Sequence, residues 1–232
     1  MSIQENIVSI KEQMAQAARQ AGRDPSEILL CAATKMNDAE NVKQAVAGGV
    51  DCCGENRVQE LVQKLPLGAY TGKPVHFIGH LQTNKVGKVI GQVDLIQSVD
   101  RLELLACIDK EAAKRGLVQQ ILLEVNIGAE QSKSGFTPEE LYQVVESMEQ
   151  YGSVQVQGLM AIPPICEHPG ANRQYFAQMR QLFVDIQGKK YNNVSMVQLS
   201  MGMSGDYCDA ILEGSTMVRI GTAIFGARDY HK

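Results

Sequence analysis

Short apolar runs alternate along the chain with longer stretches in which apolar residues recur at helical spacing. Runs of this length, rich in Val, Ile and Leu, predict strands that are buried on both faces. The eight runs are Ile28–Ala33, Val50–Cys53, Val75–Ile78, Leu95–Val99, Ile121–Val125, Val154–Met160, Val194–Leu199 and Met217–Ile220. Strands that alternate with helices pair in parallel through right-handed crossovers. The pattern therefore predicts an α/β fold built on a parallel sheet.

Amphipathic stretches connect these runs. The clearest are Arg101–Arg115, Pro138–Tyr151 and Asn172–Gln187. An additional N-terminal helix is predicted before the first run by apolar residues at helical spacing, namely Ile3, Ile7, Ile10 and Met14. Eight strand–helix units in 232 residues match a closed (β/α)8 TIM barrel, with an open doubly wound sheet as the alternative. No linker rich in Gly, Pro or Ser divides the chain, so we expect one domain over residues 1–232.

Lys35 is the most informative single residue, because it closes the first apolar run. Functional residues of such barrels gather at the carboxyl ends of the strands. Burial over a pocket there favours a neutral amine, which can attack an aldehyde and form a Schiff base. The alternative is a structural lysine whose stem lies along the barrel while its amine reaches water.

Two loops have the composition of a phosphate site. Residues 200–205 offer two hydroxyls and two glycines just before a helix expected to begin near Asp206. Gly221 and Thr222 follow the eighth run and offer an amide and a hydroxyl. In these barrels the loops after the seventh and eighth strands frequently form a phosphate-binding site. The alternative is a pair of tight turns in which glycine supplies only backbone freedom.

Arg219 lies within the eighth run, between Val218 and Ile220, and therefore needs an acceptor inside the protein. One interpretation is a salt bridge across the barrel to Glu55 or Glu124. The other is a donor to the pyridine nitrogen of pyridoxal phosphate. A permanently charged partner does not readily accept a proton, so it would weaken the cofactor as an electron sink. That arrangement suits storage or mild chemistry.

The remaining polar candidates gave weaker signals. His76 and His80 lie at the end of the third run, and we interpret them as hydrogen-bonding residues because no further metal ligands could be assigned. Asn56 could contact a cofactor or cap the following helix. The six cysteines stand at positions 31, 52, 53, 107, 166 and 208 without a C-x-x-C motif. We therefore predict buried reduced thiols and no metal site.

Composition narrows the functional classes. Hydrophobic residues make up 44% of the chain, charged residues 21%, and the formal net charge is −4, which argues against nucleic-acid or anionic-membrane partners. The N-terminal residues lack the plan of a signal peptide, so we expect a cytoplasmic protein. The motifs of P-loop hydrolases, serine esterases and zincins are missing from the sequence.

Several long motifs, in order along the whole chain, resemble the pyridoxal phosphate homeostasis proteins. They are GENRVQE (54–60), HFIGHLQTNK (76–85), SKSG (132–135), GLM (158–160), LSMGMS (199–204), GSTMVRIG (214–221) and the terminal FGAR (225–228). The resemblance implies a barrel similar to the N-terminal domain of fold-type III pyridoxal phosphate enzymes such as alanine racemase. Cys53 and Val75 stand where family members often have Phe and Trp, and we expect this to alter packing only.

The same resemblance implies roles for eight residues. Lys35 would carry the Schiff base and Arg219 would face the pyridine nitrogen, while Ser200, Gly221 and Thr222 would hold the phosphate. Asn56, His80 and Met201 would line the pocket.

We expect a carrier of pyridoxal phosphate that delivers the cofactor to apo-enzymes, with little or no catalysis. A two-base racemase needs a second acid/base group, and Tyr207 is the nearest candidate. Lys133 is interpreted as a solvated loop charge, or else as a second amine for cofactor transfer. The alternatives are a small racemase and, from another class, a phosphate-ester barrel enzyme. No coiled-coil heptads are present, so we expect a monomer.

Overall fold

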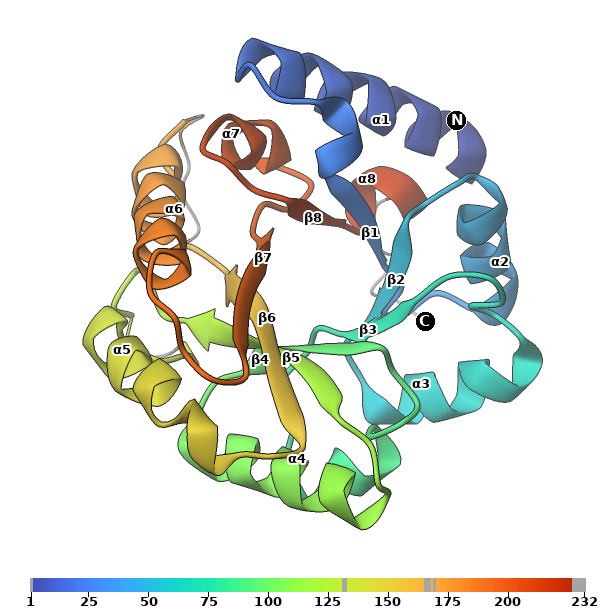
Figure 1. Cartoon of the computed structure of the whole chain (residues 1–232). Coiled ribbons are helices and arrows are strands. Elements are labelled where there is room, and N and C mark those ends of the chain that lie inside the picture. The colour runs from blue at the N-terminus through green and yellow to red at the C-terminus, as the bar shows by residue number, and fades with distance from the viewer. Residues whose placement is uncertain (1, 131–132, 165–167, 169, 227–232) are drawn as a thin grey trace.

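Eight parallel strands close into a barrel in the order β1 to β8, with β8 pairing back onto β1 (Figure 1). This computed structural model describes residues 2–130, 133–164, 168 and 170–226. The strands are β1 (Leu29–Ala33), β2 (Cys52–Glu55), β3 (Val75–Phe77), β4 (Leu95–Val99), β5 (Gln119–Val125), β6 (Val154–Ala161), β7 (Val194–Ser200) and β8 (Met217–Ile220). The predicted (β/α)8 barrel is confirmed, and the open sheet is excluded by the β8–β1 pairing.

Helices surround the barrel on its outer side (Figure 1). They are α1 (Ile3–Gln20), α2 (Ala39–Ala47), α3 (Val58–Lys64), α4 (Leu102–Lys114), α5 (Pro138–Glu146), α6 (Arg173–Gln187), α7 (Tyr207–Leu212) and α8 (Thr222–Phe225). Short 3-10 turns cover Pro25–Glu27, Leu65–Leu67, Thr83–Lys88 and Met148–Gln150. Among the residues described, no helix is both long and apolar enough to cross a membrane.

Two predicted helices differ from the observed elements. The stretch predicted over Pro138–Tyr151 breaks at Ser147, whose hydroxyl donates to the Val144 carbonyl, a local bond that competes with the helix. The connection after β3 contains only the 3-10 segment Thr83–Lys88 before β4.

The predicted N-terminal helix α1 packs against α2, α7 and α8 where the barrel closes (Figure 1). Ser2 and Glu5 form a reciprocal capping box at its start. Ile7, Ile10 and Met14 are buried, as their spacing predicted. This helix therefore covers the outside of the β8–β1 seam.

Alternation along each strand divides the side chains into two layers. Leu30, Ala32 and Cys53 belong to the large core between strands and helices. Cys31 and Cys52 point the other way and form a small separate cluster with Met217 in the barrel interior. The interior also holds buried polar side chains, among them Ser200 and Arg219, and the candidate site is built on them.

Candidate functional site

Lys35 follows β1 at the carboxyl ends of the strands and is partly buried. The next residue, Met36, has a φ of 61°, a left-handed conformation that a side chain makes costly. Its backbone N–H donates to Glu60 Oε2 at 2.7 Å, which holds this turn in place. The backbone that carries Lys35 is therefore fixed by a charged partner on a neighbouring element.

A buried ion-pair network lies directly behind this turn. The Lys64 ammonium donates to Glu55 Oε2 at 2.8 Å, to Glu60 Oε2 at 2.9 Å and to the Thr34 carbonyl at 2.9 Å. Glu55 Oε2 also accepts from the Thr34 hydroxyl at 2.9 Å and from the Tyr70 hydroxyl at 3.1 Å. Burial, followed by the charge of Glu55, raises the pKa of Tyr70. The network therefore fixes the position of Thr34, the residue immediately before Lys35.

The suggested salt bridge from Arg219 to Glu55 is therefore wrong, because Glu55 pairs with Lys64 outside the barrel wall. Sequence analysis did not anticipate Lys64 as this partner. The available signal was its i, i+4 spacing from Glu60 on one helix face.

Asn56 supplies an acceptor that no described group uses. Its side-chain Oδ1 is buried and has no hydrogen-bond partner among the residues the structure describes. The helix-capping alternative is wrong, because α3 starts after Arg57 without a side-chain cap. The loops that follow β2 and β3 are in close contact here, because a Cβ on Gly79 would lie 2.2 Å from the Asn56 carbonyl oxygen. An unsatisfied buried acceptor is costly and suits a ligand that brings a donor.

Arg219 belongs to a hydrogen-bond chain across the barrel interior. Its Nη1 donates to Ser200 Oγ at 2.6 Å and its Nη2 to the Ala161 carbonyl at 2.9 Å. The Ser200 hydroxyl donates to Gln97 Oε1 at 2.7 Å. Gln97 Nε2 in turn lies 2.9 Å from His76 Nδ1. Five strands thus contribute to one polar layer beneath the rim.

No carboxylate forms an ion pair with Arg219 within the described part of the chain, so the Glu124 alternative is also not formed. Burial lowers the pKa of the guanidinium, and the charges of Cys31, Glu124 and Asp206 oppose that shift. Burial is also the main reason that the pKa of Glu124 rises to about 7, with a further contribution from Asp100. The interior therefore holds a cation bonded mainly to neutral oxygens.

The two loops predicted to hold phosphate meet in the structure. Ser204 Oγ accepts a hydrogen bond from the Ala223 backbone N–H at 3.3 Å. Gly221 precedes α8, and Thr222 is exposed. Gly202 has a φ of +93°, and a Cβ there would lie 2.6 Å from the Ala210 Cβ, so the seventh loop needs glycine.

Ser200 and Met201 lie away from that loop contact. The Ser200 hydroxyl is fully buried between Gln97 and Arg219. The Met201 side chain packs in the large outer core. The sequence could not distinguish Ser200 from Ser204, because both are serines of one short segment. They differ only in that Ser200 is the last residue of β7, whereas Ser204 lies in the loop after it.

His80 lies on the loop after β3 with 56% of its side chain exposed. Its Nδ1 is 3.2 Å from Asp100 Oδ2, and Asp100 also accepts from Arg101 Nη1 at 2.5 Å. The prediction that His76 and His80 are hydrogen-bonding histidines is confirmed.

Lys133 and Tyr207 both have specific partners. Lys133 Nζ donates to the Pro163 carbonyl at 2.9 Å and pairs with Glu130 Oε2 at 2.5 Å, so its description as a solvated charge is wrong. The Tyr207 hydroxyl donates to Gln13 Oε1 of α1 at 2.9 Å, and burial raises its pKa to about 12.

Four residues named in the sequence analysis, Ser132, Cys166, Ala227 and Arg228, lie outside the described residues. The five cysteines that the structure describes are free thiols, and Cys31, Cys52 and Cys53 are buried, as predicted.

Residues 5–229 match the family described as alanine racemase, N-terminal domain. The chain is 42% identical over 230 residues to the pyridoxal phosphate homeostasis protein of Aquifex aeolicus, covering 99% of this chain and 100% of that protein. It is 38% identical to the protein of the same name from Escherichia coli, over 99% of this chain and 98% of that one. The chain belongs to the pyridoxal phosphate homeostasis protein family.

Solved structures agree with this family assignment. PipY of Synechococcus elongatus, solved with pyridoxal phosphate bound, has a TM-score of 0.83 and 31% identity, with 97% of this chain and 100% of PipY covered. The alanine racemase of Clostridium difficile shares the fold at a TM-score of 0.68 and 16% identity, and 58% of that chain is covered.

Proposed function

We propose that this protein binds pyridoxal phosphate as a Schiff base on Lys35 and holds it for delivery to apo-enzymes. The observation that carries the proposal is the location of Lys35, at the carboxyl end of β1 in a chain whose full-length relative PipY has been solved with pyridoxal phosphate. We propose further that residues 1–232 act as one cytoplasmic, monomeric domain.

The residues around Lys35 fit this cofactor. Arg219 has five N–H groups and uses two of them on Ser200 and Ala161, so donors remain for a pyridine nitrogen. Asn56 Oδ1 offers the ligand an acceptor that the protein leaves unused. Pyridoxal phosphate, when bound, supplies an electron-withdrawing ring to an attached amine. Arg219 keeps its proton at neutral pH and would leave that ring weakly withdrawing.

For the phosphate we propose Ser204 together with Gly221 and Thr222. The contact between Ser204 Oγ and the Ala223 amide supports this choice, because it brings both loops to one place. Ser200 was also predicted to bind phosphate, and its hydroxyl instead supports a positioning role for the Arg219 guanidinium. We therefore expect Ser204→Ala to weaken cofactor binding more than Ser200→Ala does.

The orientation of Tyr207 favours the carrier over the racemase. Its hydroxyl is bonded to Gln13 of α1, on the outer side of the barrel, and its raised pKa makes it a poor base near neutral pH. A racemase remains the second candidate, on the family match to the alanine racemase N-terminal domain.

The deciding experiment is a visible absorption spectrum of the purified protein, followed by borohydride reduction and peptide mapping. We expect a yellow protein with one phosphopyridoxyl adduct on Lys35, and no adduct in Lys35→Ala. Lys133→Ala is the matched control, since it removes another partly buried lysine and should still load at Lys35.

Two results would change the assignment. A colourless protein that takes up no added pyridoxal phosphate would favour a phosphate-ester barrel enzyme. Steady racemisation of an amino acid that disappears in Lys35→Ala would replace the carrier by a racemase.

A further inference from the structure

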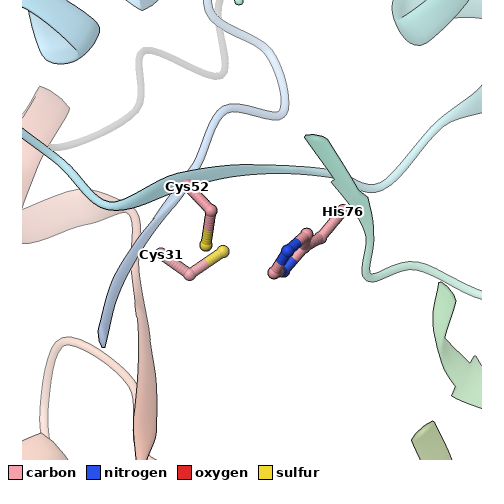
Figure 2. Close-up of side chains that lie close together, drawn as sticks. All are labelled: Cys31, Cys52 and His76. Atoms are coloured by element: carbon pink, nitrogen blue, oxygen red, sulfur yellow. The ribbon is translucent and has the colours of Figure 1, made fainter. Parts of the chain in front are cut away.

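Three inward-facing side chains on β1, β2 and β3 converge beneath the rim. The sulfur atoms of Cys31 and Cys52 and a ring nitrogen of His76 all lie within 4.8 Å of one another. Figure 2 shows the two sulfurs pointing toward each other and the imidazole facing them. Cys31 and Cys52 are register partners on adjacent strands, which places their side chains on one face. The barrel, rather than any local motif, assembles the cluster.

The cluster is buried, and the sulfur of a methionine lies beside it. Cys31 is 0% exposed, Cys52 2% and His76 5%. Met217 packs against both cysteines from β8. Its thioether lies 3.1 Å from Gln97 Nε2. Thiolates, imidazole and thioether form a soft donor set, which selects thiophilic metals over Mg²⁺ or Ca²⁺.

The three side chains are suitable metal ligands by type and position. Each can give one ligand atom to a single ion, from three adjacent strands of the barrel.

We propose that Cys31, Cys52 and His76 form a binding site for a single Cu(I) ion inside the barrel. On binding, the Cys31 and Cys52 thiols each release a proton to solvent and bind the metal as thiolates, and His76 binds through a ring nitrogen. The metal keeps its oxidation state, and two protons leave per ion bound.

Ligand number favours Cu(I) over Zn(II). Structural zinc sites close with four N or S ligands, and the described cluster offers three. Thiolate ligands are among those that select Cu(I).

Gln97 orients the imidazole of His76. The Gln97 Nε2 amide donor lies 2.9 Å from His76 Nδ1, and Gln97 Oε1 accepts from the Ser200 hydroxyl at 2.7 Å. Metal binding through His76 Nε2 requires the Gln97 amide to turn over, so that its oxygen accepts the proton on Nδ1.

The test uses the reduced, cofactor-free full chain under anaerobic conditions. Cu(I) alone is titrated against a chromophoric Cu(I) chelator, on the folded protein and during refolding so that slow entry does not hide binding. We expect one tightly bound ion, and X-ray absorption with two sulfur ligands and one nitrogen. Binding of Zn(II) but not Cu(I), or a stable Cys31–Cys52 disulfide in place of a metal, would overturn the proposal.

Matched variants identify the ligands. Cys31→Ala and Cys52→Ala should each weaken Cu(I) binding by more than about 100-fold, the upper end of what losing even a supporting residue costs. Cys53→Ala is the control, because Cys53 is the next residue on β2 and faces the outer core. A triple variant lacking Cys107, Cys166 and Cys208 should bind like the parent chain.

Folding of the variants is checked by circular dichroism and thermal unfolding against the parent chain. The X-ray absorption of the parent chain does not depend on any variant. An ion that stays bound in Cys52→Ala as in the parent chain would show that the cluster is not the site.

Discussion

Lys64 and Arg219 are both buried cations on adjoining parts of the barrel, but they are compensated differently. Lys64 contacts two carboxylates, Glu55 and Glu60, on the outer side of the wall. Arg219 contacts a hydroxyl and a backbone carbonyl in the interior. The first cation has its counter-charge built into the fold, whereas the second has neutral acceptors only.

This difference is the one expected if Lys64 serves folding and Arg219 serves the proposed ligand. Removing one member of a buried ion pair leaves the other uncompensated, so Lys64 is tied to folding. Arg219 is the register partner of Cys31, so it lies beside the thiol cluster. In the proposed function, the bound cofactor accepts a hydrogen bond from this cation.

Lys64→Met gives the largest expected effect. It leaves the buried Glu55 without a cation, while Glu60 keeps Arg57 at 3.7 Å, and we expect about 3–5 kcal/mol to be lost from the free energy of unfolding. Urea unfolding of the cofactor-free protein measures this loss. Lys43→Met is the matched control, since Lys43 is 47% exposed and 3.9 Å from Glu40, and it should change stability by less than about 0.5 kcal/mol.

Arg219→Met tests the other side of the comparison. We expect the free energy of unfolding to change by less than about 1 kcal/mol, because a buried charge without a carboxylate partner is removed. Pyridoxal phosphate should bind about 10- to 100-fold more weakly, the range for one charge-assisted hydrogen bond. Spectrophotometric titration measures the affinity. A loss of stability as large as that of Lys64→Met would remove the distinction between the two cations.

Glu124→Gln tests, through the pH dependence of stability, whether the interior around Arg219 holds a neutral or a charged carboxyl group. The pKa of Glu124 is raised to about 7, so the fold favours its protonated form, and that stability is lost as pH rises through 7. The variant should nearly match the parent chain near pH 4.5 and exceed it by about 3 kcal/mol at pH 8, since one pKa unit corresponds to about 1.4 kcal/mol. Urea unfolding of the parent chain and the variant at both pH values measures this difference. The lowered pKa of Cys31 gives stability the opposite pH dependence, but Cys31 is present in both proteins and its contribution cancels. A constant difference would mean that Glu124 is ionised throughout.

Tyr207→Phe is expected to have the smallest effect. It removes one hydrogen bond to Gln13 and should cost about 1 kcal/mol of unfolding free energy. Cofactor affinity should stay unchanged, because the hydroxyl faces α1. Thermal unfolding and cofactor titration check the two statements, and a change in affinity alone would return Tyr207 to the list of site residues.

Local pattern was enough to predict the architecture and the position of Lys35. The eight apolar runs correspond to the eight strands, and two of them, Leu95–Val99 and Met217–Ile220, have the same bounds in the structure. Burial of a strand on both faces demands a continuous apolar run, which is why this signal is strong in a parallel barrel.

The partners of the charged groups could not be predicted from pattern. Glu55 and Glu124 were both suggested for Arg219, yet Glu55 points outward to Lys64 and Glu124 forms no ion pair with it among the described residues. Ser200 and Ser204 are equivalent as residue types, and only the exit of the chain from β7 assigns one to the interior and the other to the loop contact.

The sequence by itself determined the barrel, the amphipathic helix over its seam and the lysine at a strand end, because these depend on the spacing of neighbours along the chain. The tertiary structure decided which polar groups meet. Cys31, Cys52 and His76 are 21 and 24 residues apart in sequence and share no motif, but strand register brings them within 4.8 Å. Contacts of that kind are set by which strands are adjacent and by which face each residue occupies, and both are properties of the closed sheet.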